Sequence, residues 1–251
     1  DYESFNTKSY NENLQYFGDI VGQRIASASD PVEEKIGDAL CAFLEDFTEE
    51  RELRILFDVS SCSRKTMAEV LLAVGARVGE RGRLFCAYAL SEYDVPPDSE
   101  RPSHISEPVV GDLSGWSEDL SKPPCAVIGL GFEPGRALGC IDYLEIPSVR
   151  LFLPHGPDQR FEEAVGVANK SLIGEAGADS VLHYDVMNPC DTYQRLESLL
   201  FGLVPRSRPV IIPLGPKIFA AVSICLAVQM LPKVCVWRTS SGFDENTSDR
   251  R

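Results

Sequence analysis

Three segments of this chain combine an apolar strand, a short loop of Gly, Ser or Pro, and a cationic residue at the start of a helix. They are ILFDVSSCSRKTMAEVLLAV (55–74), AVIGLGFEPGRALGCIDYL (126–144) and VIIPLGPKIFAAVSICLAV (210–228). Free backbone N–H groups and the positive end of the helix dipole favour an anion at such a helix start. Loops at the carboxyl ends of parallel strands meet at one edge of an α/β sheet. We therefore expect the three cationic helix starts to share one crevice that binds an anionic ligand.

The first loop, DVSSCSRKT, offers hydroxyl groups and two cations around the first turn of its helix. Ser60, Ser61 and Ser63 can donate hydrogen bonds without bulk, and Arg64 and Lys65 supply positive charge. The structural alternative is that one of these serines only caps the helix. Asp58, at the end of the strand, can hold a ligand hydroxyl group or simply fix the loop.

Two catalytic or cofactor motifs fail on spacing. Cys62 lies near a helix start, which lowers a thiol pKa, but the Arg that a C-x5-R phosphatase needs at position 68 is Ala68. In GLGFEPGR the third glycine of the dinucleotide pattern G-x-G-x-x-G is replaced by Pro134. Gly129 and Gly131 still allow close backbone approach, while Phe132 can stack on a base and Glu133 can accept a hydrogen bond from its edge. Core packing of Phe132 is the alternative.

The third loop, PLGPKIFAA, makes its turn at Gly215 and presents Lys217 as a point charge. It is too short for the phosphate-binding pattern G-x-x-x-x-G-K-[ST], so kinase or NTPase chemistry of that type is disfavoured.

Two further strand ends add candidate residues to the same edge. The strand after the third loop ends in WRTSSG and adds Arg238 and Thr239. His155, at the end of another strand, can act as a general acid or base near neutral pH, although a solvent-exposed histidine in a turn is the commoner reading.

Composition restricts the partners. The net charge is −14, and residues 1–52 hold 13 acidic against 4 basic residues. Such a surface opposes binding to a long nucleic acid, which relies on many Lys and Arg side chains. A small anion in a local basic pocket remains compatible with it. No apolar run is long enough to cross a membrane.

The eight cysteines contain no C-x-x-C pair and only three histidines accompany them. We therefore expect no zinc site, no cofactor, and buried free thiols in a reducing, cytoplasmic compartment.

Strands that alternate with helices predict an α/β fold. We expect a Rossmann-like, mostly parallel sheet of six to seven strands with helices on both faces, over residues 53–240. An acidic helical segment (1–52) precedes it and packs on it, an excursion loop (94–124) interrupts it with a short hairpin near 109–116, and a tail (241–251) follows. A single helix is expected over 161–176.

The early Asp-x-Ser-rich loop and the late Gly-x-Lys loop before an apolar helix resemble the CRISPR-associated Rossmann-fold (CARF) sensors and their relatives in bacterial defence systems. Gly215, Pro216 and Lys217 stand where that family often has Gly-Thr-Lys. The resemblance implies a homodimer whose two edges form one pocket for a cyclic oligonucleotide or a similar nucleotide signal. Effector chemistry in such proteins usually lies in another domain, so we expect a piece of a longer protein or a separate partner.

Our leading hypothesis is a nucleotide-sensing regulatory domain in prokaryotic antiviral defence. The alternatives are a hydrolase of phosphodiester or glycosyl bonds, including a sensor that slowly cleaves its ligand with His155, and an inactive protein-interaction module. The predicted ligand-binding residues are Asp58, Ser60, Ser61, Ser63, Arg64, Lys65, Gly131, Phe132, Glu133, Arg136, His155, Gly215, Lys217, Arg238 and Thr239.

Overall fold

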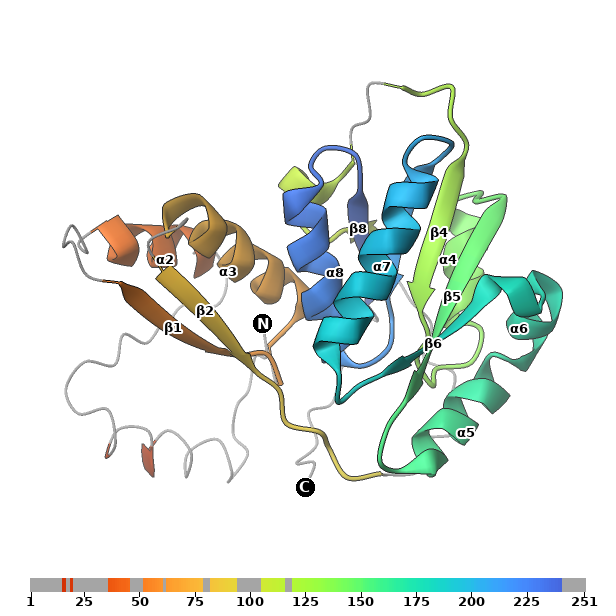
Figure 1. Cartoon of the computed structure of the whole chain (residues 1–251), viewed down its shortest axis with the longest axis horizontal. Helices are drawn as coiled ribbons and strands as arrows, with labels where there is room; N and C mark the ends of the chain where they lie inside the picture. Colours follow the sequence, from red (N-terminus) through yellow and green to blue (C-terminus); the bar gives the residue numbers. More distant parts are fainter. Residues whose placement is uncertain are drawn as a thin grey trace.

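The computed structural model has a mixed α/β fold with two separate sheets (Figure 1). It describes residues 15–16, 19, 36–45, 52–60, 62–78, 82–93, 105–115 and 119–240. Ser61, most of the acidic segment 1–52, and the tail (241–251) lie outside the described residues.

The smaller sheet consists of two parallel strands, β1 (Leu53–Asp58) and β2 (Gly82–Ala87), joined by helix α3 (Arg64–Arg77). Alternate side chains of both strands face α3 and α2 (Ile36–Glu45), and helix α2 packs on α3. On the outer face Leu56 and Phe85 lie side by side in register and are 75% and 50% exposed. A parallel sheet with one uncovered face is unusual. The sequence predicts that these strands belong to the main sheet, and this prediction is wrong.

The larger sheet has six strands in the order β3-β8-β7-β4-β5-β6. All neighbours run parallel except β3 and β8. The strands are β3 (Ile105–Pro108), β4 (Pro124–Gly129), β5 (Ser148–His155), β6 (Val181–Asp185), β7 (Arg208–Pro213) and β8 (Cys235–Ser240).

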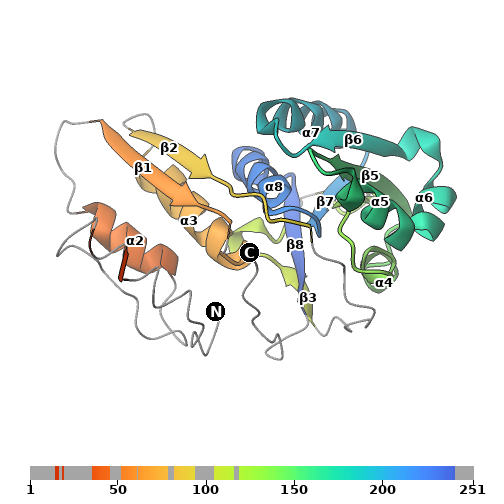
Figure 2. The ribbon, with the colours of Figure 1, turned by 90° about the horizontal axis from the view of Figure 1, so that it is seen from below.

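Both faces of this sheet are covered, which explains why its strands read as continuous apolar runs. The cores on the two faces are separate: one contains α7, α8 and part of α3, and the other contains α4, α5 and α6 (Figure 2). The helices are α4 (Arg136–Tyr143), α5 (Gln159–Ala168), α6 (Lys170–Ala176), α7 (Pro189–Leu203) and α8 (Lys217–Gln229), with short 3-10 turns at Gly111–Leu113 and Ala178–Ser180.

Two predictions of local structure are wrong. The helix expected over 161–176 is broken at Asn169, whose buried side chain donates to the carbonyl groups of Gly131 and Val165. In place of a hairpin near 109–116, the excursion contributes the edge strand β3 and a 3-10 turn. Both features depend on partners distant in sequence.

The chain order of the strands reverses between β4 and β7. The chain proceeds from β4 to β5 and β6 on one side, then returns through α7 to β7 on the other side of β4 and continues to β8. The loops that leave β4 and β7 therefore turn to opposite faces of the sheet. In open α/β sheets, ligands bind outside the carboxyl ends of the strands at such a reversal.

Candidate functional site

The first turns of α3 and α8 meet at the carboxyl end of β7. Arg64 Nη2 donates to the carbonyl oxygens of Leu214 and Gly215, each at 3.0 Å. Lys217 Nζ donates to the carbonyl oxygen of Cys62 at 2.8 Å. The first and third loops are thus in contact even though β1 is not part of the six-stranded sheet. We call residues 62–64 and 214–217 the α3–α8 junction.

The loop after β4 packs directly against this junction. The backbone N–H groups of Leu214 and Gly215 both donate to the carbonyl oxygen of Gly129 at 2.9 Å. A Cβ atom on Gly131 would lie 2.8 Å from the Leu214 oxygen, and one on Gly215 would lie 2.3 Å from the Leu130 oxygen. Only glycine permits backbones to approach this closely. All three predicted loops therefore have backbone at the reversal point.

Cationic side chains and two helix starts lie together at the junction. Helix α3 begins with Arg64 and Lys65 after its cap Ser63, and α8 begins with Lys217 after Pro216, which provides no side-chain cap. The positive ends of two helix dipoles reinforce these cations. In a chain with a net charge of −14, this is a local site suited to a negatively charged group.

Two tyrosines complete the junction, and sequence reasoning missed both. Tyr184 of β6 is 1% exposed, and its hydroxyl oxygen lies 3.5 Å from the position that a Cβ atom of Gly215 would take. Tyr88, which follows β2, is half-buried; burial raises its pKa, and the nearby backbone N–H of Lys217 opposes that rise. In VLHYDV, Tyr184 reads as an ordinary aromatic residue of a strand, so the only sequence signal is its position near the strand's end.

Residues 88–93 cross the carboxyl edge of the sheet from the start of α8 to the start of α5 (yellow in Figure 1). The backbone N–H of Ala89 donates to Ser60 Oγ at 2.8 Å. At the far end, the ring of Tyr93 packs edge-on against Phe161 at 5.0 Å, and the Arg160 guanidinium lies over Tyr93 at 4.7 Å. This connecting segment therefore forms an outer wall of the candidate site.

Most polar residues of the first loop hold the loop itself. Asp58 Oδ1 accepts the backbone N–H of Ser60 at 2.8 Å, and Ser63 caps α3 by accepting the N–H of Thr66 at 3.0 Å. The structural alternatives for Asp58 and Ser63 are therefore supported by direct hydrogen bonds.

The other two residues of this loop differ in exposure. Lys65 is exposed on the first turn of α3. Burial raises the pKa of the Cys62 thiol, although Lys217 opposes the rise. A protonated thiol is a poor nucleophile.

The remaining predicted residues lie around the edge of the sheet at varying distances from the junction. Phe132 packs against the core on the α4 face, and Arg136 pairs with Glu133 at 3.2 Å. His155 ends β5, where it is in register with Asp185 of β6. Because β4 lies between β5 and β7, His155 is two strands away from β7. Arg238 of β8 pairs with Glu107 of β3, and Thr239 is its neighbour along β8.

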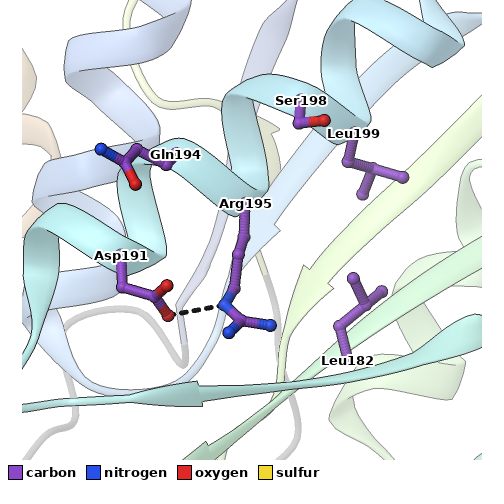
Figure 3. A pocket seen from close by; sticks show the side chains of 6 residues that line it. All are labelled: Leu182, Asp191, Gln194, Arg195, Ser198 and Leu199. Carbon is purple, nitrogen blue, oxygen red and sulfur yellow. Dashed lines mark hydrogen bonds and ion pairs between the residues drawn. The ribbon is translucent and has the colours of Figure 1, made fainter.

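A shallow depression lies elsewhere, between the edge strand β6 and helix α7 (Figure 3). Its lining combines two leucines with polar side chains, and Asp191 and Arg195 pair with each other inside it. Because its one anion and one cation neutralise each other, this depression has no charge preference for a ligand. Its lining residues are Leu182, Asp191, Gln194, Arg195, Ser198 and Leu199.

No protein-family model matches this chain, and comparison with curated proteins gives no significant match. Within the residues that the structure describes, no helix has the length and apolar character to span a membrane. All eight cysteines are free thiols, but the expectation that they are buried is wrong for most of them: only Cys125, Cys140 and Cys235 are buried, and Cys86 and Cys190 are exposed.

Proposed function

We propose that this chain is a regulatory ligand-binding domain with a Rossmann-like sheet, and that its α3–α8 junction binds the phosphate of a nucleotide-type signal. The observation that carries the proposal is the meeting of two helix starts, with Arg64 and Lys217, at the reversal of strand order. Helix starts, cations and glycine loops are the three features with which proteins of this architecture hold phosphates.

An anionic oxygen would be a better acceptor for these cations than the carbonyl groups they now contact. Hydrogen bonds to an ionised acceptor are roughly twice as strong as those to a neutral one. Arg64 and Lys217 both reach across the boundary between the β1–α3–β2 unit and the larger sheet. A ligand that binds these two cations would change how tightly the β1–α3–β2 unit is held to the larger sheet. Such a change would relay the occupancy of the site to a partner.

The nucleotide class comes from the resemblance to CARF sensors, supported by the position of Gly215, Pro216 and Lys217 at the start of the apolar helix α8. The homodimer, the role in antiviral defence and the separate effector stay predictions of that resemblance. The hydrolase alternative gains no support from geometry, because His155 lies two strands from the strand that leads into the junction.

Isothermal titration of the wild-type chain with inorganic phosphate, mononucleotides, cyclic dinucleotides and larger cyclic oligonucleotides tests the proposal. We expect saturable binding of at least one nucleotide, tighter than that of inorganic phosphate, with the ligand recovered intact. Absence of binding by every nucleotide would overturn the proposal. Recovery of cleaved nucleotide, lost in His155→Ala, would instead support the hydrolase.

A further inference from the structure

Tyr184 presents a buried hydroxyl group that has no hydrogen-bond partner among the described residues. Its ring is packed between Phe152 and Phe219, with ring centroids at 6.3 and 5.0 Å, in the core that covers the α7 and α8 face. The aromatic contacts alone would be made equally well by phenylalanine. Burying the hydroxyl therefore costs desolvation free energy that no hydrogen bond within the described part of the chain offsets.

This hydroxyl points at the α3–α8 junction. It lies 3.5 Å from the position of a Cβ atom on Gly215, the residue that precedes the α8 cap Pro216. Arg64 is close enough to act on the phenol electrostatically, as is Tyr88. Burial, the largest influence, keeps the pKa of Tyr184 well above its ordinary value. The phenol is therefore protonated at neutral pH and can donate a hydrogen bond.

We propose that the Tyr184 hydroxyl donates to an anionic oxygen of the ligand, at the inner end of the α3–α8 junction. This inference rests on the proposed function and adds to it a specific contact from β6, a strand that contributes none of the three loops. The ligand chemistry is a phosphate group, whose oxygens accept several hydrogen bonds at once. Arg64 and the start of α8 would hold the same group from the opposite side.

Access to Tyr184 requires the connecting segment to move. The Tyr88 phenol now lies near the backbone N–H of Lys217, the first residue of α8, and the Ala89 backbone N–H ties the same segment to Ser60. A phosphate oxygen would take the place of the Tyr88 phenol at that N–H. Gly215 and Lys217 are only half-buried, so the group can enter from the carboxyl edge once Tyr88 is displaced.

The test is Tyr184→Phe, titrated with inorganic phosphate, adenosine monophosphate and a cyclic dinucleotide, next to the wild type. We expect the best probe to bind about ten- to a hundredfold more weakly, because a hydrogen bond to a charged group is lost. The melting temperature should stay the same or rise, because the variant removes a buried group without a partner. The matched control is Tyr193→Phe, whose hydroxyl bonds Glu197 of α7 and Gln229 of α8; it should leave affinity unchanged.

The outcomes separate the two proposals. Equal affinity of Tyr184→Phe and wild type for a nucleotide that binds would overturn the contact from Tyr184 and leave the ligand site in place. A melting temperature that falls together with affinity would assign Tyr184 a structural role and would also overturn the contact. If the wild type binds none of the three probes or the wider nucleotide panel, the proposed function and this inference both fail.

Discussion

Gly215→Ala is expected to destabilise the fold by about 1–3 kcal/mol, whereas Gly202→Ala is expected to stabilise it by about 0.5–1 kcal/mol. The same added methyl group meets opposite surroundings at the two positions. At Gly215 it would lie 2.3 Å from the backbone oxygen of Leu130, so the loops after β4 and β7 must separate. At Gly202, inside helix α7, it meets nothing within 4 Å, and alanine has the better helix propensity.

Urea unfolding of both variants measures this difference through the denaturation midpoint. Gly215→Ala should also weaken nucleotide binding, because the separated loops no longer place Arg64 and Lys217 together. Equal stability of the two variants would contradict the close packing of the loops at the strand reversal. Gly139→Ala in α4, which also has open space around it, serves as a second helical control.

Removing the charges of the junction is expected to have the largest effect on binding. Arg64→Gln and Lys217→Gln should each weaken nucleotide affinity by about tenfold, and the double variant by about a hundredfold or more, because each change removes a charge-assisted hydrogen bond. Titration calorimetry measures the loss. Arg64→Gln also loses two hydrogen bonds between the loops and Lys217→Gln loses one, so a modest fall in melting temperature of a few degrees is expected as well.

Lys65→Gln provides the matched control for charge. Lys65 follows Arg64 in the first turn of α3 but is exposed. Its replacement changes the net charge of the chain by the same amount as Lys217→Gln, so a smaller loss of affinity, about twofold, is expected from screened electrostatics alone. An equal loss in Lys65→Gln and Lys217→Gln would show that overall charge, and no specific contact, governs binding.

Apolar runs predicted several elements of the larger sheet correctly, because these elements are determined locally. The apolar strand that begins the segment 126–144 corresponds to β4, and the apolar segment after Lys217 corresponds to α8. The break at Asn169 was not predictable, because it depends on a side-chain bond to Gly131, on another loop. The pairing of β3 with β8 and the separation of β1 and β2 from the main sheet likewise depend on partners distant in the chain.

The candidate site was predicted in part. The first and third loops were predicted to be neighbours, and Arg64 does contact Gly215, but for a different reason: α3 packs on α8, while β1 lies outside the larger sheet. The roles of Asp58 and Ser63 in loop structure were foreseen as alternatives. Tyr88 and Tyr184 were not identified, because the importance of each depends on where its hydroxyl lies in three dimensions. Whether the junction binds a nucleotide stays a prediction.

Hydrogen exchange of the wild type, with and without the tightest-binding nucleotide of the panel, tests the central claim most directly. Binding at the junction predicts slower amide exchange in residues 62–66, 129–133 and 214–219, with faster exchange in the displaced segment 88–93. The residues that line the depression between β6 and α7 should keep their amide exchange rates, apart from those next to Tyr184. Protection confined to α7 and that depression, with the junction unaffected, would contradict the account.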